Sequence, residues 1–265
     1  MPPKPKKIKK RVSFSKIDSF SDSKDKGTPS PDSRSVSPET AETSADEITD
    51  VFNVPKPRTS VLLIPFQLPL MGYALFHQFH INSQVLDGLL SSLISLAALQ
   101  FVQGSILVKN VTRRKKISLF AFPNGGELMY LVISAFLTAV AALPIFVVLL
   151  VFGAPIGSLS LETFYLSGHL AFLTVFPLLA TYKFTDSDAG SIWYNLVTFQ
   201  VPNFYANQVY LQAVGAIVGC WLGVTPIPLD WDRDWQQWPI TLVVGAYGGS
   251  FVAATISYLY NITVQ

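Results

Sequence analysis

The sequence predicts an all-α membrane protein, a six-span helical bundle that follows a disordered cytoplasmic N-terminal tail. Half of the residues are hydrophobic and the mean hydropathy is positive, which is high for a soluble domain. Twelve of the nineteen Lys and Arg residues lie in residues 1–60. Beyond them, apolar stretches of about 20 residues recur, which is the length that crosses a bilayer. We therefore divide the chain into a tail, residues 1–60, and a transmembrane domain, residues 61–265.

The predicted tail is basic at its start and then rich in Ser, Thr and Pro, with few aromatic residues. Such a segment cannot bury enough apolar surface to offset the entropy lost on ordering. No apolar stretch follows the basic start, so the tail does not have the pattern of a secretory signal peptide. The Lys and Arg cluster in residues 4–11 is expected to hold the tail on the cytoplasmic side, near anionic lipid.

Six segments have the length and composition of a membrane span. They are residues 61–80, 86–108, 128–152, 159–182, 208–228 and 239–260. Lys and Arg favour the cytoplasmic side, and they gather in the predicted loops near 109–127 and 183–207, whereas Arg233 is alone on the other side. Both termini are therefore predicted to be cytoplasmic. The sequons at Asn110 and Asn261 then face the cytoplasm and should carry no sugar.

Small residues mark the last two predicted spans. Gly215, Gly219 and Gly223 follow one another at four-residue spacing, and residues 245–250 are also rich in glycine. This spacing lets helix backbones approach closely, so it predicts tight packing against another helix of this chain or of a partner. Room for a lipid on the same face is the alternative.

Two ionisable residues lie inside the predicted span 159–182. Glu162 and His169 are seven residues apart, so a helix places them on one face, about 10 Å apart along the axis. Ionisable groups are costly in a bilayer and therefore point to function more often than in soluble proteins. Both a ligand role and hydrogen bonding between helices are open from the sequence.

The loop before the last predicted span concentrates charge and aromatic rings. It contains Asp230, Trp231, Asp232, Arg233, Asp234, Trp235 and Trp238. The alternating Asp residues could offer oxygen ligands to a divalent ion, whereas Trp is typical of the membrane interface and Arg233 could pair with a neighbouring carboxylate. No nucleophile stands beside a base, so we assign no catalytic residue, metal or cofactor.

Two stretches resemble the PIG-F family of glycosylphosphatidylinositol (GPI) anchor synthesis. One is PIPLDWDRDWQQWPITLVVGAYGG, and the other is VFGAPIGSLSLETFYLSGHLAF, which contains Phe152, Gly153, Ala154, Pro155, Glu162 and His169. The resemblance covers most of residues 128–260. It implies a multi-pass protein of the endoplasmic reticulum that binds and stabilises the enzymes that transfer phosphoethanolamine to mannoses of the GPI precursor. It also implies that the metal site and the catalysis belong to those partners.

We therefore expect an accessory subunit whose partners are a GPI ethanolamine phosphate transferase and membrane lipid or the GPI precursor, and not nucleic acid. The residues expected to contact partner or lipid are Phe152, Gly153, Ala154, Pro155, Glu162, His169, Asp230, Trp231, Asp232, Arg233, Asp234, Trp235 and Trp238. Two alternatives remain from the residues. The chain could itself be a metal-dependent phosphoryl or glycosyl transferase, or it could be a lipid carrier.

Overall fold

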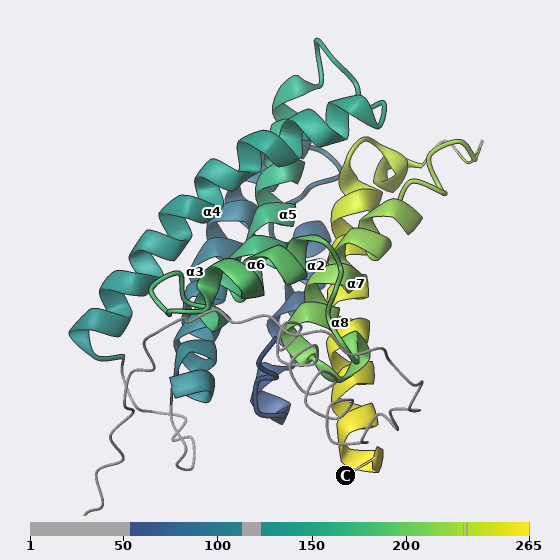
Figure 1. The fold of residues 1–265 in the computed structure, drawn as a ribbon. Coiled ribbons are helices and arrows are strands. Elements are labelled where there is room, and N and C mark those ends of the chain that lie inside the picture. Colours follow the sequence, from purple (N-terminus) through teal and green to yellow (C-terminus); the bar gives the residue numbers. More distant parts are fainter. Residues whose placement is uncertain (1–53, 113–122, 230, 232, 265) are drawn as a thin grey trace, which may run out of the picture. The chain divides into compact units, whose positions relative to one another are not determined.

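The computed structural model describes residues 54–112, 123–229, 231 and 233–264, and this part of the chain is helical without strands (Figure 1). The α-helices are α2 (Gln67–His77), α3 (Val85–Thr112), α4 (Gly125–Val151), α5 (Ser160–Thr181), α6 (Ala189–Val197), α7 (Gln208–Leu222) and α8 (Ile240–Val264). Three short 3-10 helices accompany them: η1 (Val61–Leu63), η2 (Phe204–Ala206) and η3 (Asp234–Gln236).

Within the described residues, four helices are long and apolar enough to cross a membrane, which confirms the all-α membrane class. They are α4, α5, α8 and residues Val85–Lys109 of α3. Each coincides with a predicted span, and the ends differ by only a few residues. The hydropathy and length of these stretches were therefore sufficient to find them.

The two other predicted spans contain shorter helices, so the structure does not confirm six spans. Helix α2 has 11 residues and α7 has 15, which correspond to about 16 and 22 Å against a hydrocarbon core of about 30 Å. After α2 the chain turns through His80, whose φ of 47° is left-handed. After α7, Pro226 and Pro228 cannot continue a helix because proline lacks the backbone N–H.

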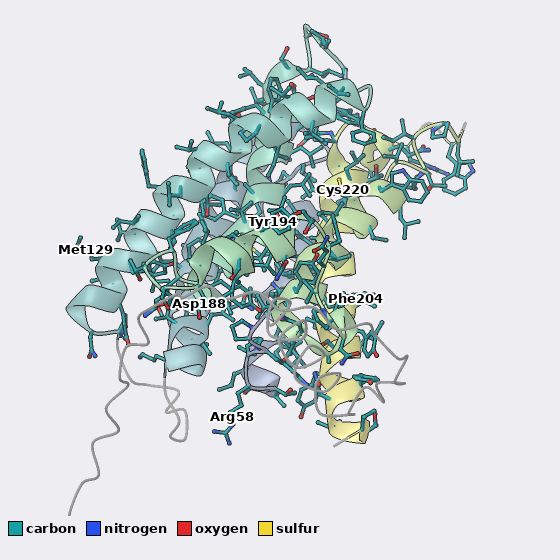
Figure 2. The ribbon with its side chains drawn as sticks, viewed as in Figure 1. Arg58, Met129, Asp188, Tyr194, Phe204 and Cys220 are labelled. Carbon is teal, nitrogen blue, oxygen red and sulfur yellow. The ribbon has the colours of Figure 1, made fainter. Side chains whose placement is uncertain are left out.

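Helix α5 is the centre of the bundle. It contacts α3, α4, α7 and α8, and Figure 1 shows it between α4 on one side and the α7–α8 pair on the other. Most of its residues are buried, including Leu166, Leu170 and Leu173. By contrast, α4 packs on α5 and α3 and keeps an exposed outer side, where Met129 lies (Figure 2).

Helices α7 and α8 pack with their backbones in contact. A Cβ atom built on Gly219 would fall within 3 Å of the Gly245 carbonyl, and one built on Gly249 would meet the Gly215 carbonyl. At the end of α7, a Cβ on Gly223 would meet the carbonyl of Thr241. The prediction of a tightly packed glycine face is confirmed, and the neighbour is a helix of the same chain.

Hydrogen bonds at the helix ends define the relative directions of α5, α7 and α8. The Trp238 indole, just before α8, donates to the Thr163 hydroxyl in the first turn of α5 at 3.0 Å. These two helices therefore start at the same end of the bundle. Asn207 caps α7 by accepting from the Tyr210 N–H, and its amide donates to Tyr182, just after α5. Helix α7 therefore runs back from the end of α5 toward the start of α8.

The segment before α2 lies at the opposite end of α8. Lys56 donates to the Asn261 side chain near the end of α8, and the Tyr182 hydroxyl donates to the Pro55 carbonyl at 3.1 Å. Further along, Gln67 donates to Gln103 of α3. Residues 54–60, assigned to the predicted tail, thus contact the bundle. The predicted disorder of residues 1–53 lies outside the described residues.

Helix α6 was not predicted, since residues 183–207 were expected to form a loop. Of its nine residues, Leu196 is buried, whereas Tyr194 and Val197 are exposed. The side chain of Trp193 packs on a small cluster around Tyr182 and Leu196. A helix this short falls below the length that a span search detects.

Candidate functional site

His169 uses both ring nitrogens inside the bundle. Its side chain is fully buried, and Nδ1 lies 2.7 Å from the Tyr165 carbonyl oxygen. A carbonyl can only accept, so Nδ1 carries a proton and donates. In the neutral ring, Nε2 then accepts from the Ser92 hydroxyl of α3 at 3.1 Å, and the same hydroxyl also lies 3.0 Å from the Leu89 carbonyl of its own helix. The ring also lies 6.0 Å from that of Tyr247. His169 therefore links α5 to α3 and α8.

Glu162 lies in the first turn of α5, on the same face as His169 and about 10 Å from it by helical rise. Its side chain is half-buried, and the Oε2 atom is buried without a hydrogen-bond partner in the described part of the chain. An unpaired buried carboxylate oxygen is costly, so it is an open position for a donor. The structure does not bring Glu162 and His169 into direct contact.

The loop between α4 and α5 presents an apolar tip. Gly153, with φ of 94°, ends α4 in a conformation that favours glycine. This turn directs Phe152 outward, with 84% of its surface exposed, while Ala154 is buried. After Pro155, the Ile156 side chain is 79% exposed. Two large apolar side chains at an exposed tip indicate a surface that contacts lipid or protein.

The loop between α7 and α8 is held by Gln236, which sequence reasoning did not select. Its side-chain amide donates to the carbonyls of Pro226 and Leu229 at 2.8 Å each, and its side-chain oxygen accepts from the Arg233 N–H at 2.9 Å. The Gln236 side chain thus closes the segment from Pro226 to Gln236 on itself. Trp231 and Trp235 pack with their ring centres 5.9 Å apart.

The charged residues of this loop are only partly described. Asp230 and Asp232 lie outside the described residues, so the possible metal site formed by three Asp residues is not tested. Where the structure is described, Arg233 and Asp234 form no ion pair, and no three His, Cys, Asp or Glu side chains cluster as a metal site would need. The pairing of Arg233 with Asp232 stays a prediction.

Trp238 and Thr163 join the two loop regions. Their hydrogen bond connects the Asp- and Trp-rich loop to the first turn of α5, one residue after Glu162. Thr163 in turn donates to the Leu159 carbonyl at 3.0 Å. Of the predicted site residues, Trp238 and Glu162 therefore lie close together, whereas His169 lies deeper in the bundle. Thr163 and Ser92 were missed by sequence reasoning because hydroxyls are common in helices that pack in membranes.

The fold and these residues define a class of protein: a helical membrane protein whose identified polar contacts mainly join helices and brace loops. Ser92 and His169 form a hydrogen-bonded pair of a hydroxyl and an imidazole, but both side chains are fully buried between α3 and α5, so the pair joins helices and is not exposed to a substrate. Exposed aromatic and aliphatic side chains lie at both ends of α5: Phe152 and Ile156 in the loop before it, and Tyr194, Val197 and Phe199 in and after α6.

The chain belongs to the GPI biosynthesis protein family Pig-F, whose model matches residues 63–258. This match confirms the resemblance inferred from the two motifs. Glycosylphosphatidylinositol anchor biosynthesis protein 11 of Debaryomyces hansenii is 39% identical over 210 residues, which are 78% of this chain and 86% of that protein. The protein of the same name from Candida albicans is 40% identical over 128 residues, 48% of each chain.

A further relative is the PIGF/3-ketodihydrosphingosine reductase fusion protein of Schizosaccharomyces pombe. It is 38% identical over 117 residues, which are 44% of this chain and 23% of the fusion protein. No solved structure matches the fold. The family therefore indicates a role in GPI-anchor biosynthesis. The structure adds the positions of the helix contacts and loops described above.

Proposed function

We propose that this chain is an accessory subunit in GPI-anchor biosynthesis. It binds and stabilises the membrane enzymes that transfer phosphoethanolamine to mannoses of the GPI precursor. The observation that carries the proposal is the family membership together with the use of the conspicuous polar residues. His169 joins α5 to α3, and Trp238 joins the loop before α8 to α5. These contacts stabilise the fold of the chain, as expected of a subunit that supports another protein.

We further propose a six-crossing arrangement in the endoplasmic reticulum membrane with both termini cytoplasmic. Helices α5 and α8 start at one end, and α7 connects the end of α5 to the start of α8, which supports a crossing by α7 with the turns after it. The segment from Lys56 to the start of α3 runs from the end of α8 to the opposite end, which supports a crossing that includes α2. The loops with Phe152 and Trp235 then face the lumen.

The partner surface would combine two exposed apolar regions. One is the tip formed by Phe152 and Ile156. The other is the outer face of α4, where exposed side chains recur every three or four residues, as on one face of a helix; they are Met129, Val132, Phe136, Val140, Leu143 and Val147. A partner helix on this face and a lumenal domain on the tip would be held by the same subunit.

The loop residues Asp230–Trp238 and Glu162 are proposed to brace the partner or to contact the glycolipid beside this tip. The buried Oε2 atom of Glu162 has no partner in the described residues, which supports a contact with a donor from outside the chain. Replacing Asp230 and Asp234 together by Asn removes two charges while keeping side-chain size. This variant should lower the amount of bound transferase without unfolding the chain.

The test is purification of the intact protein from its native cell in mild detergent, followed by identification of proteins that co-elute in near-equal amounts. A large metal-dependent phosphoethanolamine transferase is the expected partner. The double variant Phe152→Ser with Ile156→Ser should lose it, because both side chains are highly exposed and their replacement leaves the core intact.

Tyr194→Ser is the matched control, since Tyr194 is also exposed and lies on α6, away from the α4–α5 loop. This variant should retain the transferase. Elution of the unmodified chain alone would contradict the accessory role. In that case the carboxylates of the loop would be tested for a metal-dependent activity of the purified chain that EDTA abolishes.

A further inference from the structure

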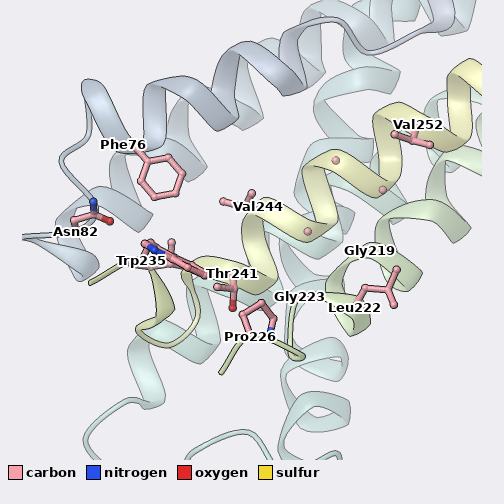
Figure 3. Close-up of a pocket in the computed structure, with 14 residues that line it drawn as sticks. Phe76, Asn82, Gly219, Leu222, Gly223, Pro226, Trp235, Thr241, Val244 and Val252 are labelled. Atoms are coloured by element: carbon pink, nitrogen blue, oxygen red, sulfur yellow. The ribbon is translucent and has the colours of Figure 1, made fainter. Parts of the chain in front are cut away.

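A cavity of about 680 Å³ lies beside the contact between α7 and α8 (Figure 3). It is bounded by α8, the end of α7, the turn between α2 and α3, and the loop that carries Trp235. We call it the α8 groove. Its side-chain lining is largely apolar, with Phe76, Leu222, Pro226, Val244 and Val252. Because α8 is long and apolar enough to span, the groove lies along a membrane helix.

Glycine residues keep the α8 groove open. Gly219, Gly223, Gly245 and Gly249 line it, and the backbone contacts of α7 with α8 leave no room there for a side chain. Gly248 lines it as well, but a Cβ added to Gly248 would meet nothing within 4 Å. The first four glycines are explained by helix packing. The empty space above Gly248 is not, so it is available to a ligand.

Polar groups occur at one end of the groove. The Thr241 side chain is 92% buried, since only 8% of the residue is exposed, and its Oγ1 atom has no hydrogen-bond partner in the described residues. In Figure 3, Thr241 lies beside Trp235 and Pro226, and Asn82 lies at the same end, whereas Val252 lies at the other. An unpaired buried hydroxyl is costly and gains from a ligand that accepts its hydrogen bond.

The dimensions favour a lipid chain over a helix. Thr241 and Val252 are 11 residues apart, which is about 16 Å by helical rise and about half of a hydrocarbon core of about 30 Å. The groove thus has the depth of one leaflet. A helix that spans the membrane would cross both leaflets, whereas the groove extends over only about half of the hydrocarbon core. The observed volume is in the usual range for small ligands.

We propose that the α8 groove binds one acyl chain of a glycerolipid from the leaflet at the N-terminal end of α8. The chain lies over Gly248 toward Val252, and the Thr241 hydroxyl donates to an ester carbonyl of the lipid. This site goes beyond the proposed function and does not require the transferase. It gives the purified chain a lipid-binding activity of its own.

The test uses the purified full-length protein in phosphatidylcholine vesicles that contain a phosphatidylcholine with a diazirine in one acyl chain. After irradiation, mass spectrometry of peptides locates the adducts. We expect them on α8 between Val244 and Val252, above the level on the outer face of α4, where only bulk lipid is in contact.

Gly248→Leu places a side chain in the groove at a position where the added Cβ meets nothing within 4 Å. Each methylene of the lipid kept out weakens binding about fourfold, so loss of two or more should lower the adduct yield at least about tenfold. Gly72→Leu is the matched control, since Gly72 of α2 also has nothing within 4 Å and does not line the groove. It should label as the unmodified protein does.

A second variant keeps the test independent of folding. Thr241→Val preserves shape and removes an unpaired hydroxyl, so its melting temperature without lipid should stay the same or rise, whereas its adduct yield should fall. Adducts on α8 no stronger than those on α4, or an adduct yield that neither Gly248→Leu nor Thr241→Val lowers, would overturn the proposal.

Discussion

At the scale of single residues, buried polar side chains in this bundle connect helices. Ser92 and His169 are 77 positions apart in sequence, and both are fully buried. In a membrane the hydrophobic effect does not drive helices together, so van der Waals packing and hydrogen bonds between helices contribute more to the stability of helix association. A polar residue in a span is therefore not in itself a ligand site, and its partner within the chain has to be identified first.

Replacing Ser92 by Ala should destabilise the protein modestly and leave GPI assembly intact. The change removes the hydrogen bond to His169, and bonds of this kind between membrane helices contribute about 0.6 kcal/mol on average. The measurement is the free energy of unfolding in mixed detergent micelles. Ser95→Ala is the control, because Ser95 is half-buried and its hydroxyl donates to the Ser91 carbonyl of its own helix.

A different result would assign His169 another role. If Ser92→Ala abolished GPI assembly while the unfolding free energy stayed unchanged, the function of His169 would extend beyond joining α3 and α5. The neutral ring accepts from Ser92, so the loss would then point to the orientation of the ring rather than to packing.

At the scale of elements, the α7–α8 pair depends on glycine at particular positions. Gly219→Ala should destabilise the protein by about 1–3 kcal/mol, because the added methyl group would overlap the Gly245 carbonyl and force the helices apart. Thermal unfolding in detergent measures the effect.

Gly248→Ala provides the comparison for this prediction. Its added methyl group meets nothing within 4 Å, and alanine favours a helix by up to about 1 kcal/mol over glycine, so stability should be unchanged or higher. Equal losses at Gly219 and Gly248 would show that helix propensity or lipid exposure, and not backbone contact, determines the outcome.

The elements also show what could be predicted from the sequence. The spans around α3, α4, α5 and α8 were predictable because each has one long apolar stretch. The spacing of Gly215, Gly219 and Gly223 predicted a close neighbour but could not identify α8. Helix α6 was missed because nine residues carry too little signal.

The candidate site was predictable only in part. Phe152, Glu162 and Trp238 belong to conspicuous motifs, and their positions at the ends of predicted spans could be read from these motifs. The hydrogen bond of Trp238 to Thr163 joins residues 75 positions apart, and the bonds of Gln236 depend on a loop that closes in three dimensions. Pairings of this kind follow from the packed fold and not from local composition.

At the scale of the whole molecule, the proposed orientation can be tested with inserted glycosylation sites. A short exposed linker carrying Asn-Gly-Thr should gain sugar when it is placed after Gly157, and none when it is placed after Asp186. The first position lies between α4 and α5 and the second between α5 and α6. A mass shift that a glycosidase removes is the measurement.

The natural sequon at Asn261 cannot replace this experiment. The Asn261 side chain is 2% exposed, and its amide nitrogen donates to the carbonyls of Ala206 and Ser257 at 2.9 and 2.8 Å. In the folded protein it is unavailable for glycosylation on either side of the membrane. Sugar on the insertion after Asp186 and none on that after Gly157 would reverse the proposed orientation.

The glycine contact of α7 with α8 also has a consequence for biosynthesis. Translation proceeds from the N-terminus at about 5–20 residues per second, so α7 is complete roughly 2–8 seconds before the end of α8 has been made. During that interval the glycine face of α7 has no neighbour. The hairpin is thus the last part of the bundle to assemble, and newly made chains that stall there are those that chaperones and proteases would encounter.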